Sequence, residues 1–392
     1  MKLLTFTTLY PNSVQQNHGI FVENRIKHLV ANSEVRTIVV APVPWFPFKS
    51  KIFGQYARFA KVPKQEIRND IKVFHPRFLL IPKIGMSIAP VLMALACIRI
   101  FHKIISDGYI FDVIDAHYFY PDGVAATILS KIFKKPLVIT ARGTDLNLIP
   151  KYKLPRSMIQ WEARHSSAMI TVCQALKDTL IELGVDEAKV TVLRNGVDLV
   201  RFSPPDDRKS LREKLNITTN ALLSVGHLIT RKGHDLVIAA LVDIPETVLF
   251  IAGDGPEKAA LVKLVYGMGF EKRVVFLGEI SHDQLCEYYG AVDALVLASS
   301  REGWANVLLE AMACGTPVVA TNVWGTPEVV ACKEAGVLVE RNVDSIAQGI
   351  LYLIENYPDR KQTRIYAEQF SWDATTEGQF NLFTKLINEG ER

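Results

Sequence analysis

Short apolar runs of strand length alternate along most of the chain with longer stretches whose apolar residues recur at helical spacing. This alternation is typical of βαβ units, in which helices connect parallel strands. In the second half the predicted strands are 221–225, 247–252, 273–277, 294–298, 317–321 and 337–339. Six strands with five crossovers describe a complete doubly wound α/β domain.

The first half shows the same alternation and is predicted to form a second doubly wound unit. Its predicted strands are 3–8, 35–40, 113–116, 136–140, 168–172 and 190–193. The stretch after Asn195 is rich in proline and turn residues, as a linker between domains is, and we place the hinge near 196–206. The prediction is therefore two Rossmann-like domains, 1–198 and 199–371, with a ligand-binding cleft between them at the carboxyl ends of the strands. The helical segment 372–392 has no strand after it and is expected to pack back on the first domain.

Composition changes this picture only through the distribution of charge. The chain has 392 residues, of which 49% are hydrophobic and 22% charged, as expected for a globular protein of two domains. The formal net charge is +4, but residues 1–200 carry 26 Lys and Arg against 15 Asp and Glu, whereas residues 201–392 carry 19 against 26. A basic first half joined to an acidic second half favours an anionic partner for the first half.

Much of the positive excess lies in residues 42–84, where nine Lys and Arg are interleaved with aromatic residues. Basic side chains beside aromatic ones suit an anionic membrane surface. The alternative interpretation is a solvated insertion whose aromatic residues pack on the domain. Nucleic acid would use the same charges, but no nucleic-acid-binding module is recognisable, so no nucleic-acid partner is predicted.

The five cysteines are an odd number without a C-x-x-C pair, which makes a disulfide framework or structural zinc site unexpected. The N-terminal apolar run is too short for a signal peptide. The longest apolar stretch is 13 residues, Met86 to Ile98, whereas a spanning helix needs about 20. We therefore expect a cytoplasmic protein without a transmembrane anchor, whose membrane contact, if any, is peripheral at the inner face of the membrane.

The most informative segment follows the predicted strand 294–298 and reads S-R-E-G-W-A-N-V-L-L-E-A-M-A-C-G-T-P-V-V-A-T from Ser300. Glu302 falls in the loop at the ligand end of the sheet, and Glu310 is the lone charge in an apolar helix. A favourable interaction with the helix dipole would explain an isolated Glu310 equally well. Two carboxylates, a glycine and helix N–H groups together could hold a sugar hydroxyl, a ribose and a phosphate.

This Glu-x7-Glu segment closely resembles the signature of family 4 retaining glycosyltransferases, which have the two-domain GT-B fold. Other segments agree in order and spacing: Gly19–Val22, Asp115–His117, Asn195–Asp198, Arg231–Gly233 and Gly253–Pro256. The resemblance implies that Glu302 lies by the donor sugar and that Glu310 binds the ribose of a nucleotide. It also implies that domain 1–198 binds the acceptor and domain 199–371 binds the nucleotide sugar. The rest of the glutamate loop is expected to line the donor site, namely Gly303, Trp304, Ala305, Asn306 and Val307.

A loop separates Lys232 from the end of the predicted strand 221–225, so its ammonium group can face a departing diphosphate. Considered alone, Lys232 is interpreted more simply as an ordinary exposed lysine. In the family this lysine binds the donor phosphates, with an arginine about five residues before it. Here that earlier position is His227, and Arg231 is a candidate replacement for the missing cation. The resemblance also places Gly253 and Gly255 in a loop that lines the donor side. No D-x-D motif occurs, so no metal and no cofactor are predicted, and Lys232 with the helix N-terminus near Asn306 is expected to stabilise the leaving group.

On the acceptor side, His117 ends the predicted strand 113–116 and matches the family's histidine near the donor sugar, although most single histidines are structural. Arg142 and Asp145 follow the strand 136–140 and could bind the acceptor, or could form a solvated ion pair in a turn. Gly19 precedes a helix and can let an acceptor or a phosphate approach the backbone. With Glu302 and Lys232, His117 completes the predicted catalytic set.

The sequence thus predicts a hexosyltransferase that moves a sugar from a nucleotide diphosphate donor to a glycan or lipid-linked acceptor, with retention of anomeric configuration and without metal. The predicted pathway is cell-surface polysaccharide biosynthesis. Two alternatives remain open at this point. A nucleotide-sugar epimerase of the same fold would need no acceptor, and a catalytically silent binding subunit would explain the departure at His227.

Overall fold

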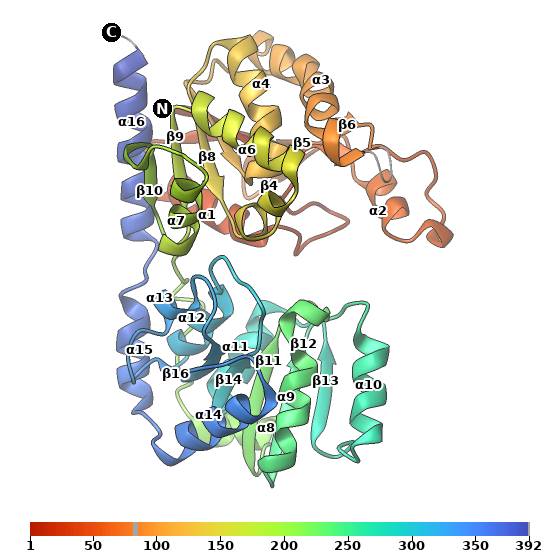
Figure 1. The fold of residues 1–392 in the computed structure, drawn as a ribbon, viewed down its shortest axis with the longest axis vertical. Coiled ribbons are helices and arrows are strands. Elements are labelled where there is room, and N and C mark those ends of the chain that lie inside the picture. Colours follow the sequence, from red (N-terminus) through yellow and green to blue (C-terminus); the bar gives the residue numbers. More distant parts are fainter. Residues whose placement is uncertain (81–84, 391–392) are drawn as a thin grey trace. The chain divides into compact units, whose positions relative to one another are not determined.

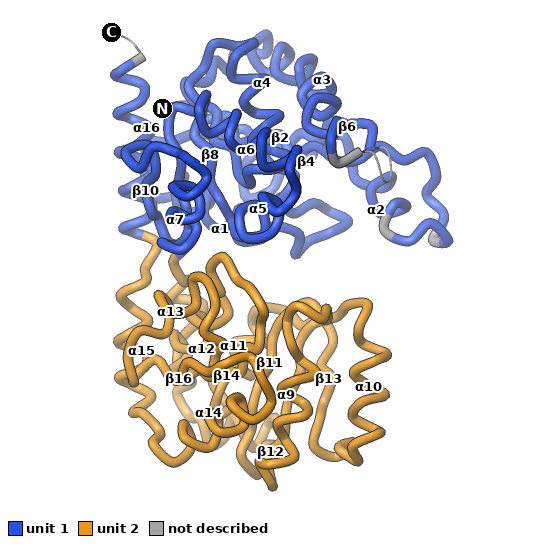
Figure 2. Tube along the Cα trace, viewed as in Figure 1, with its two compact units in different colours: residues 1–195, 373–392 blue, residues 196–372 orange. Residues whose placement is uncertain are grey.

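The chain is described by a computed structural model that covers residues 1–80 and 85–390. It divides into two compact units, coloured separately in Figure 2. Unit 1 contains Met1–Asn195 together with the C-terminal segment from Asp373, and unit 2 contains Gly196–Trp372. The C-terminal segment is therefore part of unit 1, although unit 2 separates it from the rest of that unit in the sequence.

In the described part of unit 1, eight strands form one sheet in the order β10-β9-β8-β7-β1-β2-β5-β4. All neighbouring strands are parallel except β4, which runs antiparallel to β5. The strands are β1 (Lys2–Phe6), β2 (Arg36–Val40), β4 (Gln65–Arg68), β5 (Ile71–Phe74), β7 (Val113–His117), β8 (Leu137–Ala141), β9 (Ala168–Thr171) and β10 (Val190–Val192). Two short strands, β3 (Val43–Pro44) and β6 (Arg77–Phe78), pair in parallel and form a separate two-stranded sheet.

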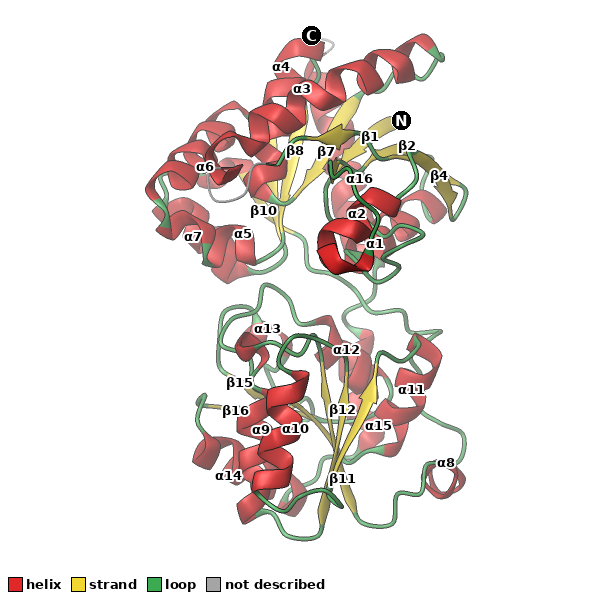
Figure 3. Cartoon of the chain, turned by 90° about the vertical axis from the view of Figure 1, so that its right-hand side faces the viewer, coloured by secondary structure: helices red, strands yellow, loops and turns green. Residues whose placement is uncertain are grey.

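Helices of unit 1 cover both faces of its sheet (Figures 1 and 3). Apolar side chains of α1 and α16 pack on β1, β7, β8 and β9, with Leu29 and Phe383 buried among them. The other face carries α3, α4 and α6, which pack against one another. The helices are α1 (Ile20–Ala31), α2 (Gln55–Lys61), α3 (Gly85–Ser106), α4 (Val124–Phe133), α5 (Thr144–Asn147), α6 (Lys153–His165), α7 (Gln174–Glu182) and α16 (Asp373–Gly390).

Unit 2 contains a wholly parallel sheet in the order β13-β12-β11-β14-β15-β16. Its strands are β11 (Asn220–Val225), β12 (Thr247–Ala252), β13 (Val274–Gly278), β14 (Ala294–Leu297), β15 (Val318–Thr321) and β16 (Gly336–Val339). The order of strands reverses beside β11, and the crevice at such a reversal is where doubly wound sheets bind ligands.

Two layers of helices sandwich this sheet (Figure 3). Buried residues of α9, α10 and α14 form one apolar core with the strands, and α8, α11, α12 and α15 pack against one another on the other side. The helices are α8 (Arg208–Lys214), α9 (His234–Ala240), α10 (Lys258–Gly267), α11 (His282–Ala291), α12 (Asn306–Ala313), α13 (Thr326–Val329), α14 (Val343–Glu355) and α15 (Arg360–Glu368).

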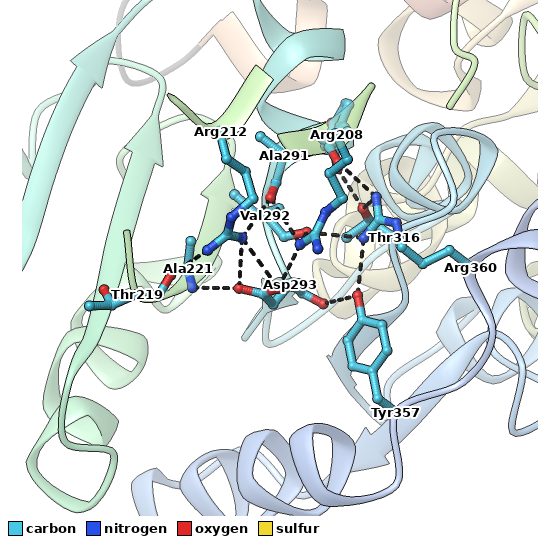
Figure 4. A network of polar contacts seen from close by, with 12 residues as sticks. Arg208, Arg212, Thr219, Ala221, Ala291, Val292, Asp293, Thr316, Tyr357 and Arg360 are labelled. Carbon is cyan, nitrogen blue, oxygen red and sulfur yellow. Dashed lines mark hydrogen bonds and ion pairs between the residues drawn. The ribbon is translucent and has the colours of Figure 1, made fainter. Parts of the chain in front are cut away.

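A polar network at the start of β11 and β14 ties these outer helices to the sheet (Figure 4). The carboxylate of Asp293 accepts hydrogen bonds from Arg208, Arg212 and the backbone N–H of Ala221. The guanidinium of Arg360 donates to the carbonyls of Gly290 and Cys314 and to the hydroxyl of Thr316. Since Ala221 and Asp293 lie at the amino ends of their strands, this network is structural and lies away from the ligand-binding ends.

The twelve strands predicted from the sequence are all present, and each end agrees within two residues. Four strands within residues 42–84 were not predicted, because that segment was interpreted as a membrane-binding surface or a solvated insertion. β5 joins the main sheet beside β2, and β4 extends it. Residues 81–84 of the segment lie outside the described residues.

The predicted 13-residue apolar stretch is part of a longer helix. α3 runs for 22 residues through Arg99 and Lys103, and its segment Ser87–Ser106 is long and apolar enough to cross a membrane by length and composition, with mean hydropathy 1.9. Met93, Cys97 and Phe101 are nevertheless fully buried in unit 1. Ile88, Val91 and Leu95, which recur at helical spacing, remain exposed.

Candidate functional site

Glu302 lies in the loop between β14 and α12, at the carboxyl end of the sheet of unit 2. Its Oε1 accepts hydrogen bonds from Lys232 Nζ at 2.6 Å and Ser299 Oγ at 2.6 Å. Arg231 NH1 lies 3.4 Å from the same oxygen and donates to the carbonyl of Arg301 at 2.7 Å. Burial acts to raise the pKa of Glu302, but the Lys232 and Arg231 cations outweigh it and hold the pKa below its ordinary value. The carboxylate is therefore buried and ionised.

Lys232 reaches this carboxylate because of the backbone around Gly233. After β11 the chain makes a short 3₁₀ turn, Thr230–Lys232, and Gly233 then adopts φ +70 at the start of α9. A Cβ at Gly233 would lie 2.2 Å from the carbonyl oxygen of Ala298, so no other residue fits without displacing the glutamate loop. The close approach holds the Lys232 turn against the loop that carries Glu302.

The loop with Gly253 and Gly255 packs on the loop that precedes Lys232. A Cβ at Gly253 would lie 2.0 Å from the carbonyl oxygen of Gly226, and one at Gly255 would lie 2.4 Å from that of Leu228. The backbone N–H of Leu228 donates to the carbonyl of Asp254 at 2.9 Å. Both glycines are required by close packing between the loops that follow β11 and β12.

Glu310 lies in the second turn of α12. Its Oε2 accepts a hydrogen bond from the hydroxyl of Tyr289 on α11 at 3.0 Å. The side chain is partly accessible, yet the surrounding protein raises its pKa from 4.5 to about 7, mainly through desolvation. Glu302 and Glu310 thus differ in charge near neutral pH, because Lys232 and Arg231 outweigh burial at Glu302, whereas at Glu310 burial outweighs the charge of Arg201.

The other predicted donor residues are in different environments. Trp304 is 7% exposed, and its ring centroid lies 6.1 Å from that of Phe370, so it packs in the interior of unit 2. Gly303 and Ala305 are buried, whereas Asn306 and Val307 at the start of α12 are partly exposed. His227 is exposed, and the ion pairs of Glu302 are made by Arg231 and Lys232. Arg231 therefore supplies positive charge beside Lys232.

A second polar cluster lies at the carboxyl ends of β7 and β8 in unit 1. His117 is fully buried, and its Nδ1 lies 2.7 Å from NH2 of Arg142. Since a guanidinium can only donate, Nδ1 is the acceptor, and the proton is on Nε2, which lies 3.2 Å from Asp115 Oδ2. Desolvation lowers the pKa of His117 to about 4, so the imidazole is neutral.

Arg142 links His117 to other parts of unit 1. Its NH1 donates to Asn195 Oδ1 at 3.1 Å, and the buried Arg25 donates to the same oxygen at 3.2 Å. Arg25 also donates to Gln379 of α16 at 2.8 Å, which ties the C-terminal helix to this cluster. The predicted role of His117 beside the donor sugar stays a prediction, because the imidazole here faces Arg142 and Asp115.

Asp145 and Gly19 support the backbone of unit 1. The buried carboxylate of Asp145 accepts hydrogen bonds from the backbone N–H groups of Phe119, Arg142 and Gly143. Asp145 thereby holds the loop that carries Arg142 instead of forming the solvated ion pair considered from the sequence. Gly19 has φ +70, and a Cβ there would lie 2.3 Å from the carbonyl of Leu9, so its lack of a side chain is needed for close packing.

Unit 1 also contains a cavity of about 260 Å³ beside the carboxyl ends of β1 and β2. Most of its wall is apolar, with contributions that include Pro42, Val43, Pro44, Phe59, Phe78, Leu80, Ala89 and Met93. The lining also includes the polar residues Thr8, Asn12, Gln15, His18 and His75. The cavity can accommodate a ligand that combines an apolar part with hydroxyl groups.

Several residues of these clusters were not predicted. Ser299 could have been found, because it is a polar residue directly after a buried strand. Asn195 was noted only as part of a matching segment, without a predicted role, and Tyr289 and Arg25 carry no local signal, since each reaches its partner from a distant part of the chain. Within residues 1–80 and 85–390, no group of three or more His, Cys, Asp or Glu side chains is placed to hold a metal ion.

Comparison with known proteins identifies the family. Residues 207–370 match the family model described as "Glycosyl transferases group 1", and residues 64–201 match "Glycosyltransferase Family 4". An uncharacterised glycosyltransferase of Methanocaldococcus jannaschii, MJ1607, is 31% identical over 70% of this chain and 75% of its own length. The chain is a family 4 glycosyltransferase.

This glycosyltransferase also resembles TuaC of Bacillus subtilis (strain 168), a protein named for teichuronic acid biosynthesis. The two are 28% identical over 89% of this chain and 88% of TuaC. Among solved structures, sucrose-phosphate synthase from Thermosynechococcus elongatus superposes with a TM-score of 0.81, at 19% identity and 99% coverage of both chains. Anabaena HepE in complex with UDP gives a TM-score of 0.75, at 20% identity, covering 98% of this chain and 100% of HepE. These likenesses confirm the predicted GT-B fold.

Proposed function

We propose that this glycosyltransferase moves a sugar from a nucleotide diphosphate donor to a glycan or lipid-linked acceptor, with retention of anomeric configuration. The observation that carries the proposal is the buried, ionised Glu302 held by Lys232, Arg231 and Ser299 at the carboxyl ends of β11 and β14. It joins two cations and a carboxylate at the point where a doubly wound sheet binds its ligand.

Lys232 and Arg231 are suited to a diphosphate that gains negative charge as it leaves. The N-terminus of α12 adds oriented N–H groups on the same side, which favours anions. Glu310, four residues into this helix, is proposed to bind the ribose as the family resemblance implies. With this charge compensation supplied by the protein, we propose that the reaction needs no metal ion.

Retention is proposed to occur without a protein base. The departing phosphate would assist deprotonation of the acceptor hydroxyl on the same face of the sugar. Consistent with this, the neutral His117 is buried against Arg142 and Asp115, where it positions Arg142 in place of acting as a free base.

The acceptor is proposed to bind unit 1. The cavity beside β1 and β2 offers a mostly apolar wall that includes polar residues, which suits a lipid-linked glycan more than a free sugar. TuaC is named for biosynthesis of a cell-wall polysaccharide. We therefore propose that the acceptor is an intermediate of cell-surface polysaccharide assembly.

We further propose that unit 1 contacts an anionic membrane from the cytoplasmic side. Trp45, Phe48 and Ile52 are between 51% and 84% exposed, and the basic residues Lys49, Arg58, Lys61 and Lys64 around them are also exposed. Phe59, Ala89 and Met93 line one cavity, so α2 and α3 meet at the cavity proposed here to hold the acceptor. A lipid-linked acceptor could then enter the cavity from the membrane.

The proposal is tested by thermal-shift measurements with UDP, GDP and ADP and with their sugar conjugates. Binding of one nucleotide to the folded state raises the melting temperature. The responding sugar nucleotide is then incubated with and without membrane lipid extract and with and without EDTA. We expect transfer only with the extract and undiminished turnover in EDTA. No shift with any nucleotide would contradict the proposal, and isomerised sugar without acceptor would instead identify an epimerase.

A further inference from the structure

Two cysteines of unit 2 meet in the interface between α11 and α12. Cys286 on α11 is partly exposed, and Cys314 directly after α12 is buried. Their Sγ atoms are 3.7 Å apart, and Cys286 Sγ also lies 3.3 Å from the carbonyl oxygen of Arg201. The pair therefore combines a thiol that a small reagent can reach with a second thiol directly behind it.

The pair is adjacent to the proposed ribose-binding carboxylate. Cys314 is four residues after Glu310, and Cys286 is three residues before Tyr289, so each pair lies on one face of its helix. The two helices are consequently linked twice, by the Cys286–Cys314 contact and by the hydrogen bond from Tyr289 to Glu310. A change in the first contact that shifts one helix against the other would therefore also affect the second.

The surrounding structure keeps the thiols together. Arg360 donates to the carbonyl of Gly290 near the end of α11 at 2.8 Å and to that of Cys314 at 3.2 Å. The hydroxyl of Thr316 donates to the carbonyl of Tyr289. The backbone segments that carry the cysteines are thus fixed to each other.

The electrostatic environment supports different roles for the two sulfurs. The contact with Cys314 lowers the pKa of Cys286 to about 6, and the same contact together with burial raises the pKa of Cys314. The thiolate, which is the nucleophile, therefore forms on the accessible cysteine. In the described part of the chain no third ligand joins them in a group able to hold a metal.

We propose that Cys286 and Cys314 are an oxidation site, at which a peroxide converts the two thiols to a disulfide that weakens nucleotide binding at Glu310. The effect on the nucleotide rests on the proposed function, whereas formation of the disulfide does not.

The chemistry balances in two steps. The Cys286 thiolate attacks one oxygen of hydrogen peroxide, which breaks the O–O bond, gives a sulfenic acid and releases hydroxide. The Cys314 thiol then attacks the Cys286 sulfur, the S–S bond forms, and water leaves. Two thiols are oxidised and one peroxide is reduced to two waters. A thiol reductant reverses the change.

Oxidation must bring the two sulfurs closer together. A disulfide needs an S–S distance of about 2.05 Å, so the sulfurs have to approach by about 1.7 Å from their 3.7 Å separation. Rotation of the two side chains supplies part of this approach, and we expect the remainder to shift α11 and α12 relative to each other. The Tyr289–Glu310 hydrogen bond lies one turn away and is the contact expected to be lost.

The first test measures the disulfide itself. Reduced full-length protein is treated with hydrogen peroxide and analysed by thiol titration under denaturing conditions and by mass spectrometry of non-reduced peptides. We expect the number of free thiols to fall from five to three. The mass spectra should show one pair of linked peptides, which contains Cys286 and Cys314. Cys286→Ser is expected to keep its four thiols, and Cys332→Ser, which changes another partly exposed cysteine, to fall from four to two.

In Cys314→Ala the sulfenic acid on Cys286 has no partner and should be trapped by a dimedone reagent. Oxidation of wild-type Cys286 to sulfinic acid without linkage, or linkage to any other cysteine, would overturn the proposal.

The second test measures the consequence for the nucleotide. The thermal shift with UDP or GDP is compared in reduced, oxidised and re-reduced protein. We expect the shift to be lost on oxidation, restored by reductant, and retained by peroxide-treated Cys286→Ser. An undiminished shift in protein with the disulfide present would refute the effect on the site. If reduced protein shows no shift with UDP, GDP or ADP, the proposed function fails, while the disulfide is still judged by its mass.

Discussion

At the scale of single residues, Glu302 and Glu310 show how two carboxylates on one loop and helix acquire different chemistry. Glu302 is surrounded by Lys232, Arg231 and Ser299 and stays ionised although it is buried. Glu310 accepts a hydrogen bond from a tyrosine hydroxyl, and burial outweighs this bond and the charge of Arg201, so its pKa rises to about 7. The difference follows from the cations that the Lys232 turn brings to one carboxylate and not to the other.

Replacing Lys232 with alanine, or Glu302 with glutamine, is expected to lower kcat by a factor of about 10²–10³. Removing one preorganised group that faces developing charge costs about 2.7–4 kcal/mol in the transition state. Steady-state kinetics with the identified donor measures the loss. Lys258→Ala, which removes an exposed lysine of the same unit, is the control and should retain full turnover. Equal turnover in Lys232→Ala and the control would remove Lys232 from the site.

Glu310→Gln is expected to weaken nucleotide binding yet stabilise the fold above pH 7. Because the folded pKa is raised to about 7, the unfolded state loses its proton first between about pH 4.5 and pH 7, and the wild-type protein loses stability across that window. Glutamine removes this loss, which we put at about 1–2 kcal/mol after allowance for partial exposure. Thermal unfolding should show a higher Tm for the variant at pH 8 and no difference at pH 4. A Tm advantage that does not depend on pH would exclude this cause. Glu355→Gln on α14 is the exposed control.

The site residues that could be predicted from the sequence are those that follow a predicted strand, because that position places them at the ligand-binding edge of the sheet. Lys232, Glu302 and Gly253 each follow a buried strand, so the carboxyl end of a parallel sheet brings them together. Tyr289 differs in this respect, and so does the pairing of Arg142, although Arg142 itself follows the buried strand β8 and was predicted from it. Tyr289 precedes its strand and reaches Glu310 only because α11 packs on α12, and the buried pairing of Arg142 with His117 depends on which strands are neighbours.

At the scale of elements, the contact between the Lys232 turn and the glutamate loop determines the site. Gly233→Ala is expected to reduce both stability and turnover, because its Cβ would lie 2.2 Å from the carbonyl oxygen of Ala298. Gly269→Ala is a matched control, since Gly269 has the same φ of +70 with nothing within 4 Å of the new Cβ. The control isolates the cost of the left-handed backbone, about 1 kcal/mol. Chemical unfolding and kinetics of both variants measure the difference, and equal losses would show that the close approach is unimportant.

The elements of the two sheets were predictable where strands are buried on both faces. β14 is a continuous apolar run, β12 is apolar after Thr247, and β11 is apolar apart from Asn220 and Ser224, as expected for parallel strands covered by helices. β5 escaped prediction because Lys72 is exposed in the middle of four residues and charged residues flank it. β4 alternates between exposed and partly exposed residues and has no buried face that would predict a strand. It is recognised as a strand by its pairing with β5.

At the scale of the whole molecule, the uneven charge belongs mainly to unit 1 and is not explained by the donor residues, which lie in unit 2. Replacing Lys49, Lys61 and Lys64 with glutamine is expected to weaken binding to anionic vesicles about 100-fold, since each basic residue near the surface contributes about 1 kcal/mol. Sedimentation with phosphatidylglycerol vesicles measures the effect, and nucleotide binding should be unchanged. The same change at Lys258, Lys263 and Lys272 of unit 2 is the control for net charge. Unchanged sedimentation of the first variant would show that these three lysines belong to a solvated surface without a membrane-binding role.

The placement of α16 in unit 1 has a consequence for synthesis of the protein on the ribosome. Unit 1 needs Phe383 in its core and Gln379 beside Arg25, yet both are encoded after the whole of unit 2. Unit 2 is a continuous stretch, so it can complete its fold while the chain is still being made. Unit 1 must wait, with an incomplete apolar face, until α16 has been made. A product truncated between unit 2 and α16 would therefore contain a complete unit 2 and an unfinished unit 1, and cellular proteases could recognise it by that exposed face.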